Sequence, residues 1–205
     1  MQATRDFDVI VFGATGFTGM LVAEYLAERY GCGGDLKWAI AGRSADRLAA
    51  LRKSLGAHAA GLETIVADSD DADALASLAA RTHVVLTTVG PYALYGSRLV
   101  AACVDAGTAY CDLAGEVQWI RRMIDKHHER AQETGARIVH CCGFDSIPMD
   151  VGVLFLQQEA KRRYDRYCTE IALFVKATRG AASGGTLASM INIIREARQD
   201  LSLIH

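Results

Sequence analysis

Three glycines near the start of the chain form a pattern that could hold a phosphate group. Gly13 and Gly16 lie between the apolar run Asp8–Phe12 and the helix-like segment Phe17–Tyr30, and Gly19 lies in the first turn of that segment. Such a loop turns tightly at its first glycine, lets a pyrophosphate approach at the second, and packs the helix closely at the third. The free N–H groups of the helix then face the phosphates. We therefore predict a dinucleotide site, rather than a purely structural turn, built from Gly13, Thr15, Gly16, Phe17, Thr18 and Gly19.

The end of the second apolar run indicates which dinucleotide binds. NAD-dependent enzymes commonly place Asp or Glu there to accept hydrogen bonds from the ribose. Here the run ends Ala-Gly-Arg-Ser, and the first carboxylate comes only at Asp46. Arg43 can pair with a 2′-phosphate, and Ser44 can donate a hydrogen bond to it. This predicts NADP(H) rather than NAD(H), although an arginine here is also typical of a solvated helix start.

Two further strand ends belong to the same predicted site. Asp68 follows the third apolar run and is a candidate acceptor for the adenine amino group, or else a helix cap. Val89, Gly90 and Pro91 follow the fourth run, which would pass beside the nicotinamide ribose. Gly90 suits a close approach of the backbone to a ligand.

Polar side chains also follow the fifth and sixth apolar runs, where a substrate would meet the nicotinamide. Such groups could orient a substrate or relay a proton during hydride transfer, and the alternative for the aspartates is helix capping. None of the seven tyrosines has a lysine four residues on, so the usual Tyr-Lys pair of short-chain dehydrogenases is not encoded. We predict that His127 and His128 are solvated and expect no metal site. The catalytic candidates are Tyr110, Asp112, Glu116 and Asp145, with Ser146 beside them.

The spacing of apolar and helix-like segments predicts the fold. Short runs rich in Val and Ile alternate with longer segments rich in Ala, Leu, Arg and Glu, which is typical of parallel strands covered by helices on both faces. We expect an α/β, doubly wound parallel sheet of the Rossmann type. The strands are expected at Asp8–Phe12, Leu36–Ala41, Thr64–Ala67, His83–Thr88, Thr108–Cys111 and Arg137–Cys141. The helices are expected at Phe17–Tyr30, Ala45–Leu55, Ala72–Ala80, Ala93–Ala106 and Val117–Thr134.

The pattern changes after Pro148, which divides the chain into two predicted domains. Residues 1–147 form the dinucleotide-binding domain, and residues 148–205 form the beginning of an incomplete α/β domain for substrate or dimerisation. Because one strand cannot make a sheet, we expect the strand there to associate with a second copy. A Ser-Gly-Gly-Thr motif before the last helix is either an anion-binding helix start or a plain turn. The expected elements are a helix at Met149–Arg163, a strand at Thr169–Thr178 and a helix at Thr186–Arg198, with the motif at 183–186.

Composition excludes several classes of protein. The 205 residues carry 22 Lys+Arg and 24 Asp+Glu, a formal net charge of −2, which argues against a nucleic-acid or anionic-membrane binder. Hydrophobic residues make up 51% of the chain, enough for a sizeable core. The six cysteines show no Cys-x-x-Cys spacing and the chain begins with no signal-like segment, so we predict reduced thiols in a cytoplasmic protein without a transmembrane segment.

Five motifs together resemble the saccharopine dehydrogenase-like oxidoreductases, in particular the branch that includes trans-acting enoyl reductases. Members are longer than this chain, so the resemblance implies an amino-terminal part. It also implies an NADP(H)-dependent oxidoreductase, a homo-oligomer that transfers hydride to a small amino-acid-like or lipid-derived enoyl substrate and could lie at a membrane surface. The motifs are Gly-Ala-Thr-Gly-Phe-Thr-Gly (13–19), Ala-Gly-Arg-Ser (41–44), Val-Gly-Pro-Tyr (89–92), Tyr-Cys-Asp-Leu-Ala-Gly-Glu (110–116) and Cys-Gly-Phe-Asp-Ser-Ile-Pro (142–148).

Two alternatives remain open at this point. Glycine loops of this form also occur in NmrA-like redox sensors, which bind a dinucleotide without turning it over. The chain could also be a catalytically inactive, cofactor-binding fragment. The motifs at 110–116 and 142–148 favour the enzyme.

Overall fold

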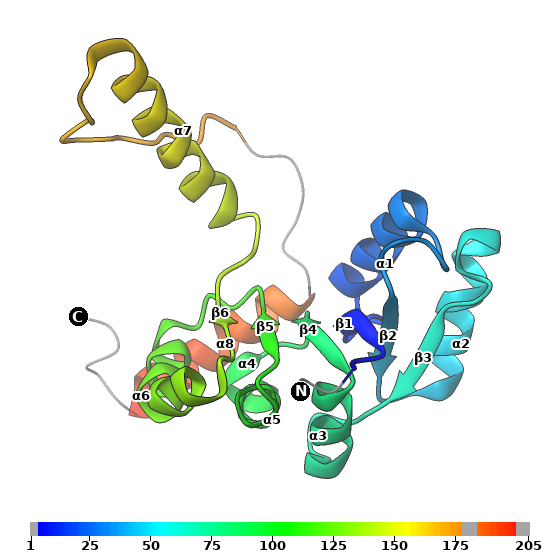
Figure 1. Cartoon of the computed structure of the whole chain (residues 1–205). Helices are drawn as coiled ribbons and strands as arrows, with labels where there is room; N and C mark the ends of the chain where they lie inside the picture. The colour runs from blue at the N-terminus through cyan, green and yellow to red at the C-terminus, as the bar shows by residue number, and fades with distance from the viewer. Residues whose placement is uncertain (1–3, 178–183, 200–205) are drawn as a thin grey trace.

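The computed structural model describes residues 4–177 and 184–199. Within them, six strands form one sheet in the order β3-β2-β1-β4-β5-β6, and every neighbouring pair is parallel (Figure 1). The order reverses between β1 and β4, which is the switch point of a doubly wound sheet. The predicted α/β fold is therefore confirmed. The strands are β1 (Phe7–Phe12), β2 (Trp38–Gly42), β3 (Glu63–Val66), β4 (Thr82–Thr87), β5 (Ala109–Cys111) and β6 (Ile138–Val139).

Helices cover both faces of this sheet, and the alternation of side chains along β1 shows the two layers. Ile10 and Phe12 join a core with α3 (Ala72–Ala80), α5 (Ser97–Ala106) and α6 (Val117–Thr134). Val11 joins a separate core with α1 (Phe17–Tyr30) and α2 (Ala45–Ser54), and the 3₁₀ turn η1 (Gly56–Ala59) follows α2. Because both faces are covered, β2 is buried along its whole length.

The helix predicted over Ala93–Ala106 is interrupted in the structure. A short helix, α4 (Tyr92–Tyr95), comes first, and α5 begins after Gly96. A side chain at Gly96 would lie 2.7 Å from the ring of Trp119 on α6, so only glycine lets α6 pack this closely. The break between α4 and α5 thus falls at the residue that packs against Trp119.

Beyond the sheet, α7 (Ile147–Tyr164) points away from the rest of the fold (Figure 1). The predicted strand at Thr169–Thr178 is wrong for the residues described, since 169–177 form no regular structure and Thr178 lies outside the described residues. The alternating side chains needed a neighbouring strand for a ladder, and no strand of the described chain lies beside them. Instead, the side chain of Gln157 bonds both the N–H and the carbonyl of Cys168.

The last helix, α8 (Gly184–Gln199), lies against α6 and confirms the helix predicted there (Figure 1). Among the described residues, no helix is long and apolar enough to span a membrane. The division of the chain at residue 147 coincides with the start of α7 but stays a prediction, as does self-association.

Candidate functional site

The glycine loop between β1 and α1 is held in a conformation that needs glycine at two positions. Gly13 has a φ of +86°, and its N–H donates to the carbonyl of Ala41 on β2 at 2.9 Å. A side chain at Gly19 would lie 2.2 Å from the carbonyl oxygen of Gly13, so α1 could not approach the loop with any larger residue there. At Gly16, by contrast, an added Cβ would meet only the Gly13 oxygen, at 3.3 Å. The loop is therefore less crowded at Gly16, where the sequence predicts the pyrophosphate, than at Gly19.

The N-terminus of α1 differs from those of the next two helices. Ser44 caps α2 by accepting a hydrogen bond from the N–H of Arg47, and Asp71 caps α3 by accepting one from Ala74. The N-cap of α1 is Gly16, and no side chain caps it. A helix N-terminus without a capping side chain offers its N–H groups and partial positive charge to an anion. This arrangement fits a bound diphosphate.

A cavity of about 330 Å³ lies in front of this helix at the carboxyl ends of β1, β2 and β4. It lies at the switch point of the sheet, where open parallel sheets bind ligands. Most of the predicted cofactor residues line it, and Tyr95, Ser69 and Gly185 join them. The lining residues are Phe12, Gly13, Thr15, Gly16, Phe17, Thr18, Gly42, Arg43, Arg47, Ala67, Ser69, Thr88, Val89, Gly90, Tyr95 and Gly185.

Two arginines border the cavity at the end of β2. The side chain of Arg43 is exposed beside it, and Arg47, one helical turn further on, donates to the carbonyl of Thr15 at 2.8 Å. Sequence reasoning missed Arg47, although a position four residues after Arg43 on a helix start lies on the same face. Ser44 is not among the lining residues, because its hydroxyl caps α2. The end of the cavity next to β2 therefore carries two cationic groups.

Some of the remaining predicted cofactor residues line the cavity, and others do not. Asp68 does not line the cavity, since its carboxylate accepts from Ser69 and from the N–H of Asp70 in a local turn. Val89 and Gly90 line it, and Pro91 follows them in a cis peptide bond. Thr88 donates from its hydroxyl to the carbonyl of Gly13 at 3.2 Å, which joins the end of β4 to the glycine loop.

The catalytic candidates at the end of β5 lie in a buried network rather than at the cavity. Asp112 is 1% exposed and accepts from the hydroxyl of Tyr110 at 2.9 Å and from the N–H groups of Ala114 and Cys141. Nδ1 of His140 lies 2.6 Å from Oδ2 of Asp112. Burial, and then the charge of Asp112, raise the pKa of Tyr110 well above its usual value. These contacts hold together the loops that follow β5 and β6.

Glu116 is also buried, and it supports the loop after β4. Its carboxylate accepts from the N–H groups of Tyr92 and Ala93 at 2.7 and 2.9 Å, and from the hydroxyl of Ser189 at 2.9 Å. It therefore caps α4 from a distance, although it stands at the N-cap position of α6. Asp145 is exposed and Ser146 is the N-cap residue of α7. None of the four catalytic candidates lines the cavity among the described residues.

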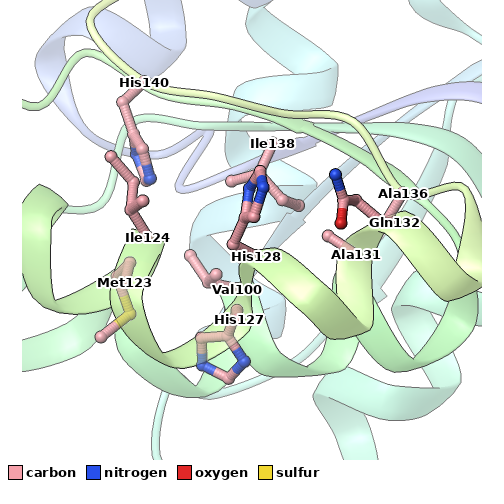
Figure 2. Close-up of a pocket in the computed structure, with 10 residues that line it drawn as sticks. All are labelled: Val100, Met123, Ile124, His127, His128, Ala131, Gln132, Ala136, Ile138 and His140. Carbon is pink, nitrogen blue, oxygen red and sulfur yellow. The ribbon is translucent and has the colours of Figure 1, made fainter.

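A second hollow of about 260 Å³ lies between α5, α6 and the edge strand β6 (Figure 2). His127, His128 and His140 line it together with apolar side chains such as Ile124 and Ile138. Within the described ranges, no group of three or more His, Cys, Asp or Glu side chains is arranged to hold a metal ion. The hollow contains none of the glycine-loop residues, so it is separate from the predicted cofactor site.

The fold and the cavity together define a dinucleotide-binding domain of the Rossmann type. Comparison with known proteins gives the family. Residues 9–139, more than half of the chain, match the saccharopine dehydrogenase NADP binding domain. The chain belongs to this family, and its cofactor is NADP(H), as the sequence predicted.

Two relatives match nearly the whole chain, and one solved structure shares its fold. A Mycobacterium tuberculosis protein named "Putative trans-acting enoyl reductase" is 47% identical over 201 residues, which cover 98% of this chain and 47% of that protein. The trans-acting enoyl reductase of Mycobacterium ulcerans is 44% identical over 200 residues, covering 97% and 47%. The chain thus spans about half the length of these relatives. Saccharopine dehydrogenase (L-Glu forming) from Saccharomyces cerevisiae shares the fold with a TM-score of 0.60 at 22% identity, covering 76% of this chain and 32% of that one.

Proposed function

We propose that this chain carries the cofactor site of an NADP(H)-dependent oxidoreductase that reduces a lipid-derived enoyl substrate. The observation that carries the proposal is one cavity bordered by two arginines and by a helix N-terminus that no side chain caps. The relatives named as enoyl reductases, which match nearly the whole chain, support the enoyl substrate over an amino-acid-like one.

Different residues of the cavity hold different parts of the cofactor. Arg43 and Arg47 pair with the 2′-phosphate, because guanidinium groups form charge-assisted hydrogen bonds to phosphate. The loop at Gly16 and the first turn of α1 hold the pyrophosphate. The backbone at Gly90 then lies beside the nicotinamide. Bound NADPH supplies the hydride for the reduction.

The buried carboxylates play a positioning part in this proposal. Asp112 holds the loops after β5 and β6 through backbone and side-chain donors, and Glu116 fixes the loop after β4. Neither carboxylate lines the cavity, so we assign neither the transfer of the substrate's proton.

A second candidate function is a redox sensor that binds NADP(H) without turning it over. The observation that favours it is that, among the described residues, none of the four predicted catalytic candidates lines the cavity. The two functions differ in one measurable property, which is whether a substrate causes the oxidation of bound NADPH.

A spectroscopic experiment separates these functions. Nucleotide fluorescence measures the binding of NADPH to the purified chain, and absorbance then follows NADPH after a 2-enoyl thioester is added. Binding followed by substrate-dependent oxidation supports the reductase, with Gly16→Val as the control that lacks the cofactor site. Binding without oxidation supports the sensor or an inactive fragment. A chain that does not bind NADPH contradicts all three.

A further inference from the structure

The first turn of α8 lies at the rim of the cofactor cavity, although α8 is far along the chain from the glycine loop. Gly185 lines the cavity with Gly90 and Tyr95. A side chain built at Gly90 would lie 3.6 Å from the hydroxyl of Ser189, one turn further along α8. The helix therefore adjoins the backbone where the proposed function places the nicotinamide.

The buried carboxylate of Glu116 connects this helix to the loop after β4, which borders the cavity. Oε1 of Glu116 accepts from the N–H of Tyr92 at 2.7 Å and from the hydroxyl of Ser189 at 2.9 Å. Oε2 accepts from the N–H of Ala93 at 2.9 Å. Because a buried carboxylate is stable only when it is hydrogen-bonded, the three donors are held together around Glu116. The loop after β4, the start of α6 and α8 thus share one polar centre.

A second set of polar contacts fixes the other end of α8. Glu196 accepts from Gln118 at 3.3 Å and pairs with Arg122 at 3.4 Å, both on α6. Seven residues separate Ser189 from Glu196, which is two helical turns, so both contacts lie on the same face of α8. Of these two sets of contacts, the one at Ser189 lies nearer to the cavity, which Gly185 of the same helix lines.

We propose that the hydrogen bond between Ser189 and Glu116 is a latch that holds α8 as a wall over the nicotinamide end of the cavity. Glu116 and Ser189 are positioning residues, since neither is among the residues that line the cavity. With the latch closed, α8 is already ordered when the cofactor arrives. Without it, binding must order the helix, and that ordering costs affinity. The inference rests on the proposed NADP(H) site.

The test compares two ligands that share only the adenosine end. NADPH spans the whole cavity, whereas adenosine 2′,5′-bisphosphate carries the 2′-phosphate without the nicotinamide. We expect Ser189→Ala to weaken NADPH binding about tenfold, on the order of one lost hydrogen bond, and to leave the bisphosphate unchanged. Ser189→Thr, which keeps the hydroxyl, should restore NADPH binding. Isothermal titration measures both dissociation constants.

Controls separate the latch from a general loss of structure. Ser77→Ala makes the same change at an exposed position of α3 and should alter neither affinity. Alanine favours a helix, so Ser189→Ala should fold, and thermal unfolding verifies this. Equal weakening of both ligands, or no weakening of either, would overturn the latch while the NADP(H) site stands. Failure of the wild-type chain to bind either ligand would instead contradict the proposed function, and the latch with it.

Discussion

Polar side chains follow the strands on both halves of the sheet, but the two halves use them differently. Near β1 and β2, Arg43 is exposed at a cavity, and the N-terminus of α1 has no capping side chain. Near β5 and β6, Asp112 is 1% exposed and accepts hydrogen bonds from Tyr110, Ala114 and Cys141. The first half thus presents Arg43 at a cavity, whereas in the second half Asp112 uses its hydrogen bonds to hold loops.

This difference distinguishes a ligand site from a structural network at the same edge of a parallel sheet. Both halves lie where such sheets bind ligands, so position alone does not distinguish them. The number of hydrogen bonds already made by each polar group does distinguish them. We therefore expect substitutions of buried, hydrogen-bonded polar groups near β5 and β6 to change stability, and substitutions of polar groups that line the cavity near β1 and β2 to change affinity.

The largest expected effect is the loss of Asp112. Asp112→Ala leaves the buried donors of Tyr110, Ala114 and Cys141 without their acceptor, and we expect the free energy of unfolding to fall by about 3–5 kcal/mol. Urea denaturation measures it. The matched control is Asp145→Ala, an exposed aspartate after β6, which should change stability by less than about 0.5 kcal/mol. Equal effects of the two variants would contradict the comparison.

The second effect concerns the glycine loop. Gly16→Val should abolish NADPH binding, a loss of at least about a hundredfold or about 2.7 kcal/mol, while the circular dichroism stays the same. A valine side chain there would take the place of the pyrophosphate. Gly19→Val should instead disrupt folding, because its Cβ would lie 2.2 Å from the carbonyl oxygen of Gly13. Normal binding by the Gly16 variant would mean that the cavity is not the cofactor site.

A smaller effect is expected for Arg47. Its side chain is exposed and already bonded to the carbonyl of Thr15, so Arg47→Ala should weaken NADPH binding by about 1 kcal/mol, or roughly fivefold. Arg52→Ala on the same helix is the control, since Arg52 donates to Leu62 and does not line the cavity. If both variants bind equally well, Arg47 takes no part in the site.

The smallest effect is a pH dependence from the hollow beside β6. Partial burial lowers the pKa of His127 below its usual value, and its Nε2 is buried without a hydrogen-bond partner among the described residues. The folded state thus disfavours protonation, so this contribution to stability is present above the unfolded pKa of about 6.5 and is lost as the pH falls below it. Urea denaturation at pH 7.5 and 5.5 should show a smaller decrease for His127→Gln than for the wild type.

Much of the cofactor site near β1 and β2 could be predicted from the sequence, because it depends on residues that are close together in the chain. The spacing of Gly13, Gly16 and Gly19 reflects steric limits within one turn. In the structure, a side chain at Gly13 or Gly19 would clash with its neighbours. The absence of an acidic residue after β2, with Arg43 in its place, gave the NADP(H) preference that the family confirms. The caps at Ser44 and Asp71 also depend only on adjacent residues.

The rest depends on contacts between distant segments, which one sequence does not reveal. His140, the residue after β6, contacts Asp112, and Ser189 contacts Glu116 across 73 positions. The strand predicted over 169–178 had an alternating pattern, but no strand of the described residues lies beside 169–177 to form a ladder. The close approach of Trp119 to Gly96, the residue at the break before α5, also comes from another helix.

The central claim is that Arg43 gives the cavity its preference for NADP(H), and a comparison of two cofactors tests it most directly. Isothermal titration of the wild-type chain should show NADPH binding more tightly than NADH. Arg43→Ala should remove most of that difference, since the 2′-phosphate loses a charge-assisted hydrogen bond of about 1.5–3 kcal/mol. Equal affinities for the two cofactors in the wild type, or an unchanged preference in Arg43→Ala, would contradict the account.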